Sequence, residues 1–99
     1  MRVTYPVIFT EVDTNILIEV PDLGILTEAN DESKAKGTMA DAIMMVKDAI
    51  SLFFTSAKEE GRDMVEPSKI SDIDISKGTF YDEGVGCVSL VDVDLVTYQ

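Results

Sequence analysis

One stretch of this sequence has helical periodicity, and stretches with strand periodicity flank it on both sides. Its apolar residues recur at spacings of three and four. They are Ala42, Ile43, Val46, Ala49, Ile50, Phe53 and Ala57. Thr38 and Asp41 form a capping-box pattern before this stretch, and Gly61 is a natural stop after it. The pattern predicts one helix over about 39–60 that packs on a sheet through its apolar stripe.

Strand-like alternation occurs in four places and predicts a sheet. We expect strands over about 2–10, 15–20, 25–29 and 87–98. In the first strand, Val3, Tyr5, Val7 and Phe9 share one face. Pro6 cannot donate a backbone hydrogen bond, so it predicts either an edge strand or a position where the ladder does not need that donor.

The polar segment over about 67–86 predicts a loop or an extra hairpin between the helix and the last strand. The element order is therefore β-β-β-α-β. A chain of 99 residues buries one compact core. The predicted fold is a single α+β domain over 1–99, an antiparallel sheet with the main helix packed on one face.

The charge balance restricts the partners of this chain. Nineteen acidic and eight basic side chains give a formal net charge of −11. Such a charge opposes direct binding to nucleic acid or to an anionic membrane surface. It also steers a basic protein toward the chain, although an acidic surface more often serves solubility.

The chain has no histidine, and Cys87 is its single cysteine. Catalysis that pairs a nucleophile with an imidazole is therefore excluded, and an internal disulfide cannot form. We expect Cys87 to be a small core residue and the chain to be cytoplasmic. The N-terminal residues lack the apolar run of a signal peptide, and no stretch approaches the length of a membrane span.

The spacing of Asp72, Asp74 and Glu83 imitates a calcium-binding loop. Lys77 stands where that loop needs glycine, and two flanking helices are not predicted, so we expect no metal there. Asp92 and Asp94 share one strand face, which we expect to be solvated. We therefore predict no metal site and no cofactor.

Some apolar residues of the helix exceed what one contact with a sheet requires. Met44, Met45 and Phe54 widen the apolar arc, which indicates a second contact. These three residues are our candidates for an oligomer contact. An alternative function is therefore a homo-oligomeric protein-interaction module without another partner.

Several segments resemble the HicB-like antitoxins, and together they cover nearly the whole chain. They are Tyr5–Phe9, Ile18–Ile25, Met39–Ile50, Glu59–Arg62, Pro67–Ser68 and Val88–Leu95. Their order and spacing carry the resemblance more than any single segment does. Residues 30–37 depart from it, because this stretch is longer and richer in lysine.

The resemblance implies a partial ribonuclease-H-like fold and a non-enzymatic antitoxin role in a type II toxin-antitoxin pair. The implied partner is a small basic ribonuclease, a HicA-like mRNA interferase, which the antitoxin binds and neutralises. Such antitoxins usually carry a C-terminal segment that binds operator DNA. The sequence given ends at Gln99 without one, so either it is part of a longer chain or this member does not bind DNA directly.

For toxin binding we predict the acidic residues of turns and edge strands. They are Glu11, Asp13, Glu19, Asp22 and Glu28. A ribonuclease-H-like fold also raises the alternative of a metal-dependent nuclease, which needs a carboxylate in the first strand. No Asp or Glu occurs between Arg2 and Thr10, so this alternative is disfavoured.

Overall fold

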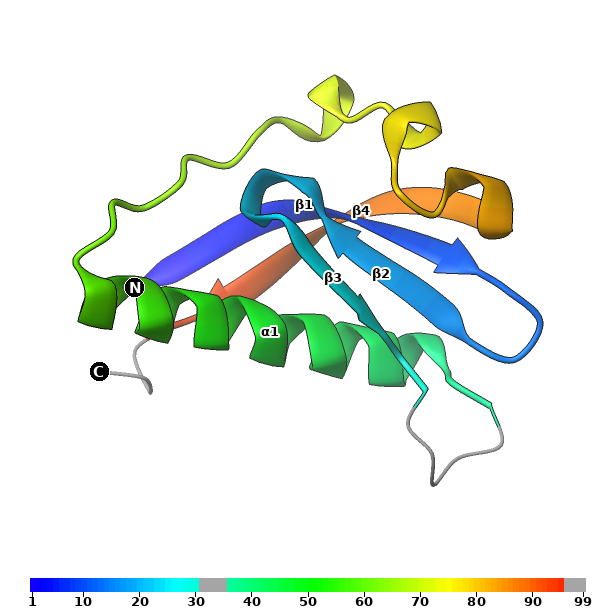
Figure 1. Ribbon diagram of the computed structural model, residues 1–99, viewed down its shortest axis with the longest axis horizontal. Coiled ribbons are helices and arrows are strands. Elements are labelled where there is room, and N and C mark those ends of the chain that lie inside the picture. Colours follow the sequence, from blue (N-terminus) through cyan, green and yellow to red (C-terminus); the bar gives the residue numbers. More distant parts are fainter. Residues whose placement is uncertain (31–35, 96–99) are drawn as a thin grey trace.

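The computed structural model describes residues 1–30 and 36–95. It contains β1 (Arg2–Glu11), β2 (Ile16–Val20), β3 (Ile25–Glu28), α1 (Met39–Glu60) and β4 (Val85–Asp94). The strands form one antiparallel sheet in the order β3-β2-β1-β4, and α1 lies across one face of it (Figure 1). The predicted α+β fold and its β-β-β-α-β order are thus confirmed. Residues 96–98 of the predicted last strand lie outside the described residues.

The ends of α1 lie where the sequence predicts them. The Thr38 hydroxyl accepts a hydrogen bond of 3.2 Å from the Asp41 amide, and the Asp41 carboxylate accepts one of 3.1 Å from the Thr38 amide. At the other end, Gly61 adopts a φ of 69°, a left-handed conformation that glycine adopts without strain.

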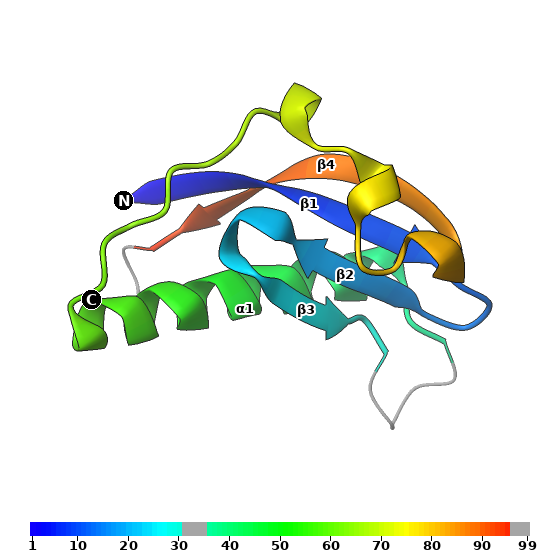
Figure 2. The same ribbon diagram turned by 45° about the horizontal axis from the view of Figure 1, so that its top comes forward.

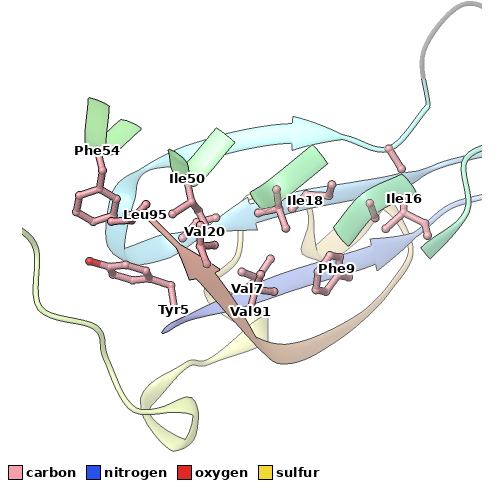
Figure 3. Packing of buried hydrophobic residues seen from close by; sticks show 14 residues of the cluster. Tyr5, Val7, Phe9, Ile16, Ile18, Val20, Ile50, Phe54, Val91 and Leu95 are labelled. Carbon is pink, nitrogen blue, oxygen red and sulfur yellow. The ribbon is translucent and has the colours of Figure 1, made fainter. Parts of the chain in front are cut away.

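The core lies between α1 and the sheet (Figure 3). It receives Tyr5, Val7 and Phe9 from β1, the face that the alternation predicts. From α1 the buried residues are Ala42, Val46, Ile50, Ser51, Phe54 and Ala57. This set is rotated from the predicted stripe, so that Ile43 is 38% exposed and Phe54 only 8%.

The other face of the sheet is covered by residues 62–84, which we call the strap (Figure 2). The strap contains three short 3-10 turns, η2 (Ile70–Asp72), η3 (Ile75–Lys77) and η4 (Tyr81–Glu83), and no hairpin. Of the two alternatives for this segment, the loop is therefore confirmed and the extra hairpin is wrong. Beneath the strap, Ile8 is only 4% exposed, so β1 is buried on both of its faces.

Pro6 lies in an inner strand, so the edge-strand alternative is wrong. Even-numbered residues of β1 turn their backbone groups toward β2, since the Val12 amide donates to the Asn15 carbonyl at 3.0 Å. Pairing between β1 and β2 covers only 8–11, so no ladder bond is required at Pro6. The second alternative, a position where the donor is not needed, is confirmed.

Candidate functional site

Five exposed carboxylates lie at one end of the sheet, where β1 and β3 end and β4 begins (Figure 1). They belong to Glu11, Asp13, Glu28, Asp82 and Glu83, which we call the acidic end. Two contacts define its geometry. Glu11 is the register partner of Val85, which closely follows η4, and Glu28 accepts a 2.9 Å hydrogen bond from Nδ2 of Asn15.

Apolar side chains accompany these carboxylates. Val85 is 79% exposed and Tyr81 is 51% exposed, and both adjoin the acidic end in sequence. Between them, position 84 requires glycine, because an added Cβ would collide with the Glu11 carbonyl. Exposed apolar groups with a charged rim are typical of surfaces that bind proteins. The acidic end is therefore the candidate contact surface for a basic protein.

A lysine is present at the same end. The Gly37 amide donates a 3.0 Å hydrogen bond to the carbonyl of Thr14 in the β1–β2 turn, which places Lys36 nearby. Among the described residues, the five carboxylates outweigh this lysine and leave the acidic end negative. At physiological salt such a field extends about 8 Å, so it acts on a partner before contact.

Two of the predicted toxin-binding acids have hydrogen-bond partners within the chain, and their role in toxin binding stays a prediction. Asp22 accepts hydrogen bonds from the amide and the hydroxyl of Ser68, at 2.7 and 2.6 Å. Glu19 accepts from the amide and the hydroxyl of Thr79, at 2.8 and 3.1 Å. Both carboxylates thus fix the strap to the sheet. Of the five predicted residues, Glu11, Asp13 and Glu28 lie together at the acidic end.

The three residues of the predicted oligomer contact lie on different sides of α1. Met44 is 71% exposed, whereas Met45 packs partly buried against the core. Phe54 lies in the core beside Tyr5, with ring centroids 5.9 Å apart. Phe54 is therefore not on the surface, because the helix turns residues 42, 46, 50, 54 and 57 toward the sheet. Whether Met44 makes an oligomer contact stays a prediction.

The prediction that Cys87 is a core residue is wrong, because its side chain is exposed. The burial of β4 explains this result. Its side chains become buried on the helix side only from Val91 onward, so α1 leaves the first half of the strand uncovered. A groove lies there instead, and Cys87 lines it.

The three acids of the calcium-like spacing do not lie together around a site for an ion. The Asp74 carboxylate caps η3 by accepting from the Ser76 amide at 3.0 Å and from its hydroxyl at 2.6 Å. The hydrogen bond from the Ser76 hydroxyl is the main cause that lowers the pKa of Asp74. Within the described ranges, no group of three or more acidic, cysteine or histidine side chains is placed to hold a metal ion.

Asp92 accepts hydrogen bonds from Arg2 and, at 3.3 Å, from the Thr4 hydroxyl. The bond from Arg2 is the main cause that lowers the pKa of the Asp92 carboxyl. This exposed ion pair lies at the end of the sheet opposite the acidic end, since Arg2 is the register partner of Asp94.

Asp82 and Glu83 complete the acidic end, but the sequence analysis placed them in a loop or an extra hairpin and did not predict them as binding residues. The pairing register of β4 with β1 would have identified them. If β4 pairs antiparallel with β1 over its full length, its first residues must lie beside the turn that follows β1. The alternation in each strand gives no information on which strands pair, so this neighbourhood was missed.

We compared the chain with family models, curated proteins and solved structures, and one solved structure has a similar fold. No family model and no curated protein matches the chain. A similar chain occurs in a solved structure described as a toxin-antitoxin complex from Streptococcus pneumoniae, with a TM-score of 0.79 and 21% identity. The similarity covers 99% of this chain and 73% of that one. The two chains share one fold.

At this identity the likeness establishes architecture and no more. Membership of the HicB-like family and the ribonuclease-H-like description stay predictions. In the ranges 1–30 and 36–95, no helix has both the length and the apolar character to cross a membrane.

Proposed function

We propose that this chain is the antitoxin component of a toxin-antitoxin pair and that it binds and neutralises a small basic ribonuclease of the HicA-like type. The observation that carries the proposal is the fold shared over 99% of the chain with a component of the Streptococcus pneumoniae complex. The sequence resemblance to HicB-like antitoxins assigns the antitoxin side of the pair.

The charge supports a basic partner independently of the fold. The net charge is −11, and the carboxylates of the acidic end are other ones than Asp22 and Glu19, which bind Ser68 and Thr79 of the strap. Enzymes that bind RNA present basic surfaces to the phosphate backbone. An acidic surface covers such a region by charge complementarity, and this contact would exclude the RNA.

We infer that the chain neutralises its partner by binding alone and that it does so in the cytoplasm. The absence of histidine and of a carboxylate in 2–10 supports the first inference, and the single cysteine supports the second. An RNA cleavage assay of the purified chain with Mg²⁺ tests the first directly. Cleavage that resists further purification would contradict it.

Co-expression tests the proposed function. The neighbouring reading frame is expressed alone and together with this chain, and growth and co-purification are followed. We expect the neighbour to arrest growth, the chain to relieve the arrest, and a basic protein to co-purify. A toxic neighbour that this chain neither rescues nor binds would refute the proposal.

A matched pair of charge variants tests the acidic end. Glu11→Lys with Glu83→Lys changes the net charge as much as Asp48→Lys with Glu59→Lys, which lie on α1. We expect only the first pair to slow association, by about tenfold at low salt, because rim charges act mainly on the association rate. Equal slowing by both pairs would mean that net charge alone steers the partner.

A second candidate function is a homo-oligomeric interaction module. The outer face of α1 exposes Met44 at 71% and Leu52 at 66%, and these residues lie eight positions apart on similar sides of the helix. Sedimentation of the purified chain over a wide concentration range tests it. Dimers that Met44→Lys dissociates would favour this function, and a monomer throughout would remove it.

A further inference from the structure

The outer edge of β4 presents backbone groups that no strand of the described residues pairs, and of these the Leu90 carbonyl accepts a 3.4 Å hydrogen bond from the Ser89 hydroxyl. β4 lies at the end of the sheet order β3-β2-β1-β4, and no segment of residues 1–30 or 36–95 pairs with its outer side. The amide of Leu95 donates to the Met1 carbonyl at 2.7 Å, so odd-numbered residues of this strand bond to β1. The N–H and C=O groups of Gly86, Val88, Leu90 and Asp92 therefore point outward.

This edge lacks the features that usually protect edge strands. β4 is ten residues long, whereas the opposite edge strand, β3, has four. Its residues 85–91 contain no charged side chain and no proline. Natural edge strands are commonly kept short, charged or interrupted so that they do not pair with other chains. A long edge strand with no charge over residues 85–91 is therefore suited to strand addition.

A groove of about 390 Å³ runs beside this edge, between β4 and the first half of α1. Its walls include Met39, Ile43 and Lys47 of α1 and the side chains of Cys87 and Ser89 of β4. Odd-numbered residues of β4 face the groove, on the side of the sheet that carries α1. A strand added to β4 would direct every second side chain into this groove, which is how strand-addition sites select their ligands.

The charges at the two ends of the edge indicate what occupies it. Asp82 and Glu83 precede the strand, and Asp92 and Asp94 end it. Arg2 and Lys47 offset part of the charge at the Asp92 end, since both lower the pKa of that carboxyl, Arg2 the more strongly through its hydrogen bond. The centre stays apolar, so the complementary strand has an apolar centre and basic flanks.

A second copy of this chain fits the edge poorly. Antiparallel pairing would set Asp92 and Asp94 of one copy near Asp82 and Glu83 of the other. Parallel pairing would set each acid near its own equivalent. Like charges on adjoining strands destabilise their pairing.

We propose that the edge of β4 binds an extended segment of the basic partner, with an apolar centre and lysine or arginine flanks, as an added fifth strand. The segment's alternate side chains fill the groove between β4 and α1. This inference rests on the proposed function and specifies how the partner docks.

Hydrogen exchange of the full chain, alone and bound to the co-purified basic partner, tests the inference. In the free chain we expect slow exchange at residues 87, 89 and 91 and fast exchange at residues 88, 90 and 92. In the complex, both sets should exchange slowly. Alkylation of Cys87 should slow as well, and one mass adduct on this chain reports it, because Cys87 is the single cysteine.

A matched pair of proline variants separates docking at β4 from a general disturbance of the sheet. Leu90 on β4 and Leu26 on β3 are 50% and 53% exposed. The amides of both point outward, since the Ala29 amide donates to the Ile16 carbonyl and odd residues of β3 thus bond to β2. We expect Leu90→Pro to weaken binding by about tenfold, because it removes the one N–H that Leu90 can donate to the added strand. We expect Leu26→Pro to leave binding unchanged.

Leu90→Lys and Leu90→Glu keep the backbone donor and provide a second test. With a basic partner, lysine should weaken binding more than glutamate does. A complex that leaves residues 88, 90 and 92 in fast exchange would overturn docking at β4 while leaving the antitoxin function intact. Protection that rises with concentration in the chain alone would assign the edge to a second copy and overturn the inference too. If no complex forms and no rescue occurs, the proposed function fails and this inference with it.

Discussion

The two faces of the sheet are covered in different ways. On one face, a helix of 22 residues buries a continuous set of apolar side chains. On the other, the strap runs across the sheet with three short 3-10 turns as its regular structure. The helix is held by many nonpolar contacts, whereas the strap is fixed at a few points by polar ones. The two layers should therefore differ in how they respond to substitution.

Side-chain hydrogen bonds tie the strap to the sheet and to η1 at three points among the described residues. Asp22 binds Ser68 and Glu19 binds Thr79, each through an amide and a hydroxyl. The hydroxyl of the buried Tyr5 donates to the carbonyl of Val65. Between these points most strap side chains are exposed. Segments with few buried apolar contacts open locally at low free energy, so the strap should open without unfolding the core.

The largest expected effect is on the helix face. Ile50 is fully buried between α1 and the sheet, and Ile50→Ala leaves a cavity there. We expect a loss of about 2–5 kcal/mol in the free energy of unfolding, measured by urea denaturation. Leu52→Ala, on the exposed side of the same helix at 66% exposure, is the control and should change stability little. Equal losses would mean that α1 packs differently.

A smaller effect is expected where the strap meets the sheet. Asp22→Ala removes both hydrogen bonds to Ser68, and we expect a loss of about 1–3 kcal/mol. Hydrogen exchange should then become faster at strap residues near Ser68 and stay slow in α1. Asp48→Ala, an exposed acid on α1, serves as the control. Faster exchange in α1 as well would show that the two layers open together.

Tyr5→Phe tests the contact that joins the two layers. It removes the hydroxyl that donates to the Val65 carbonyl and keeps the ring that packs on Phe54. Because Val65 is partly exposed, water can replace the lost donor, and we expect a loss of about 0.5–1.5 kcal/mol. Burial also raises the pKa of Tyr5, so the native protein should lose stability as the pH rises above about 10. The loss at high pH should be smaller in the Tyr5→Phe variant.

The difference between the two faces also explains what the sequence could predict. The helix over 39–60 was predicted to the residue, because its periodicity and its caps are local signals. The strap was predicted only as a loop or a hairpin, because its contacts join residues 46 and 60 positions apart. For the same reason the hydrogen bonds of Glu19 and Asp22 to the strap were not predicted. No local pattern distinguishes a carboxylate that binds a partner from one that fixes a distant loop.

The candidate site was predicted in part for a related reason. Glu11, Asp13 and Glu28 follow from the turns of the meander, which the sequence predicts. Asp82 and Glu83 depend on the pairing of β1 with β4, strands that are far apart in the sequence. The exposure of Cys87 depends on where α1 crosses β4, which periodicity does not specify. Local elements were predictable, and surfaces built from distant elements were not.

The smallest expected effect concerns Arg2 and Asp92, which form an exposed ion pair. They lie on the same face of the sheet as the strap, at a part of it that the strap does not cover. Their hydrogen bond lowers the pKa of Asp92 in the folded chain, so the pair stabilises the fold above the unfolded pKa of about 3.9. This stabilisation is lost as the pH falls through the folded pKa. Asp92→Asn should therefore lower stability slightly at pH 7, less so in high salt, and not at all well below the folded pKa. If Asp92→Asn lowered the free energy of unfolding at pH 7 as much as Asp22→Ala does, the exposed ion pair would stabilise the fold as strongly as the hydrogen bonds to the strap.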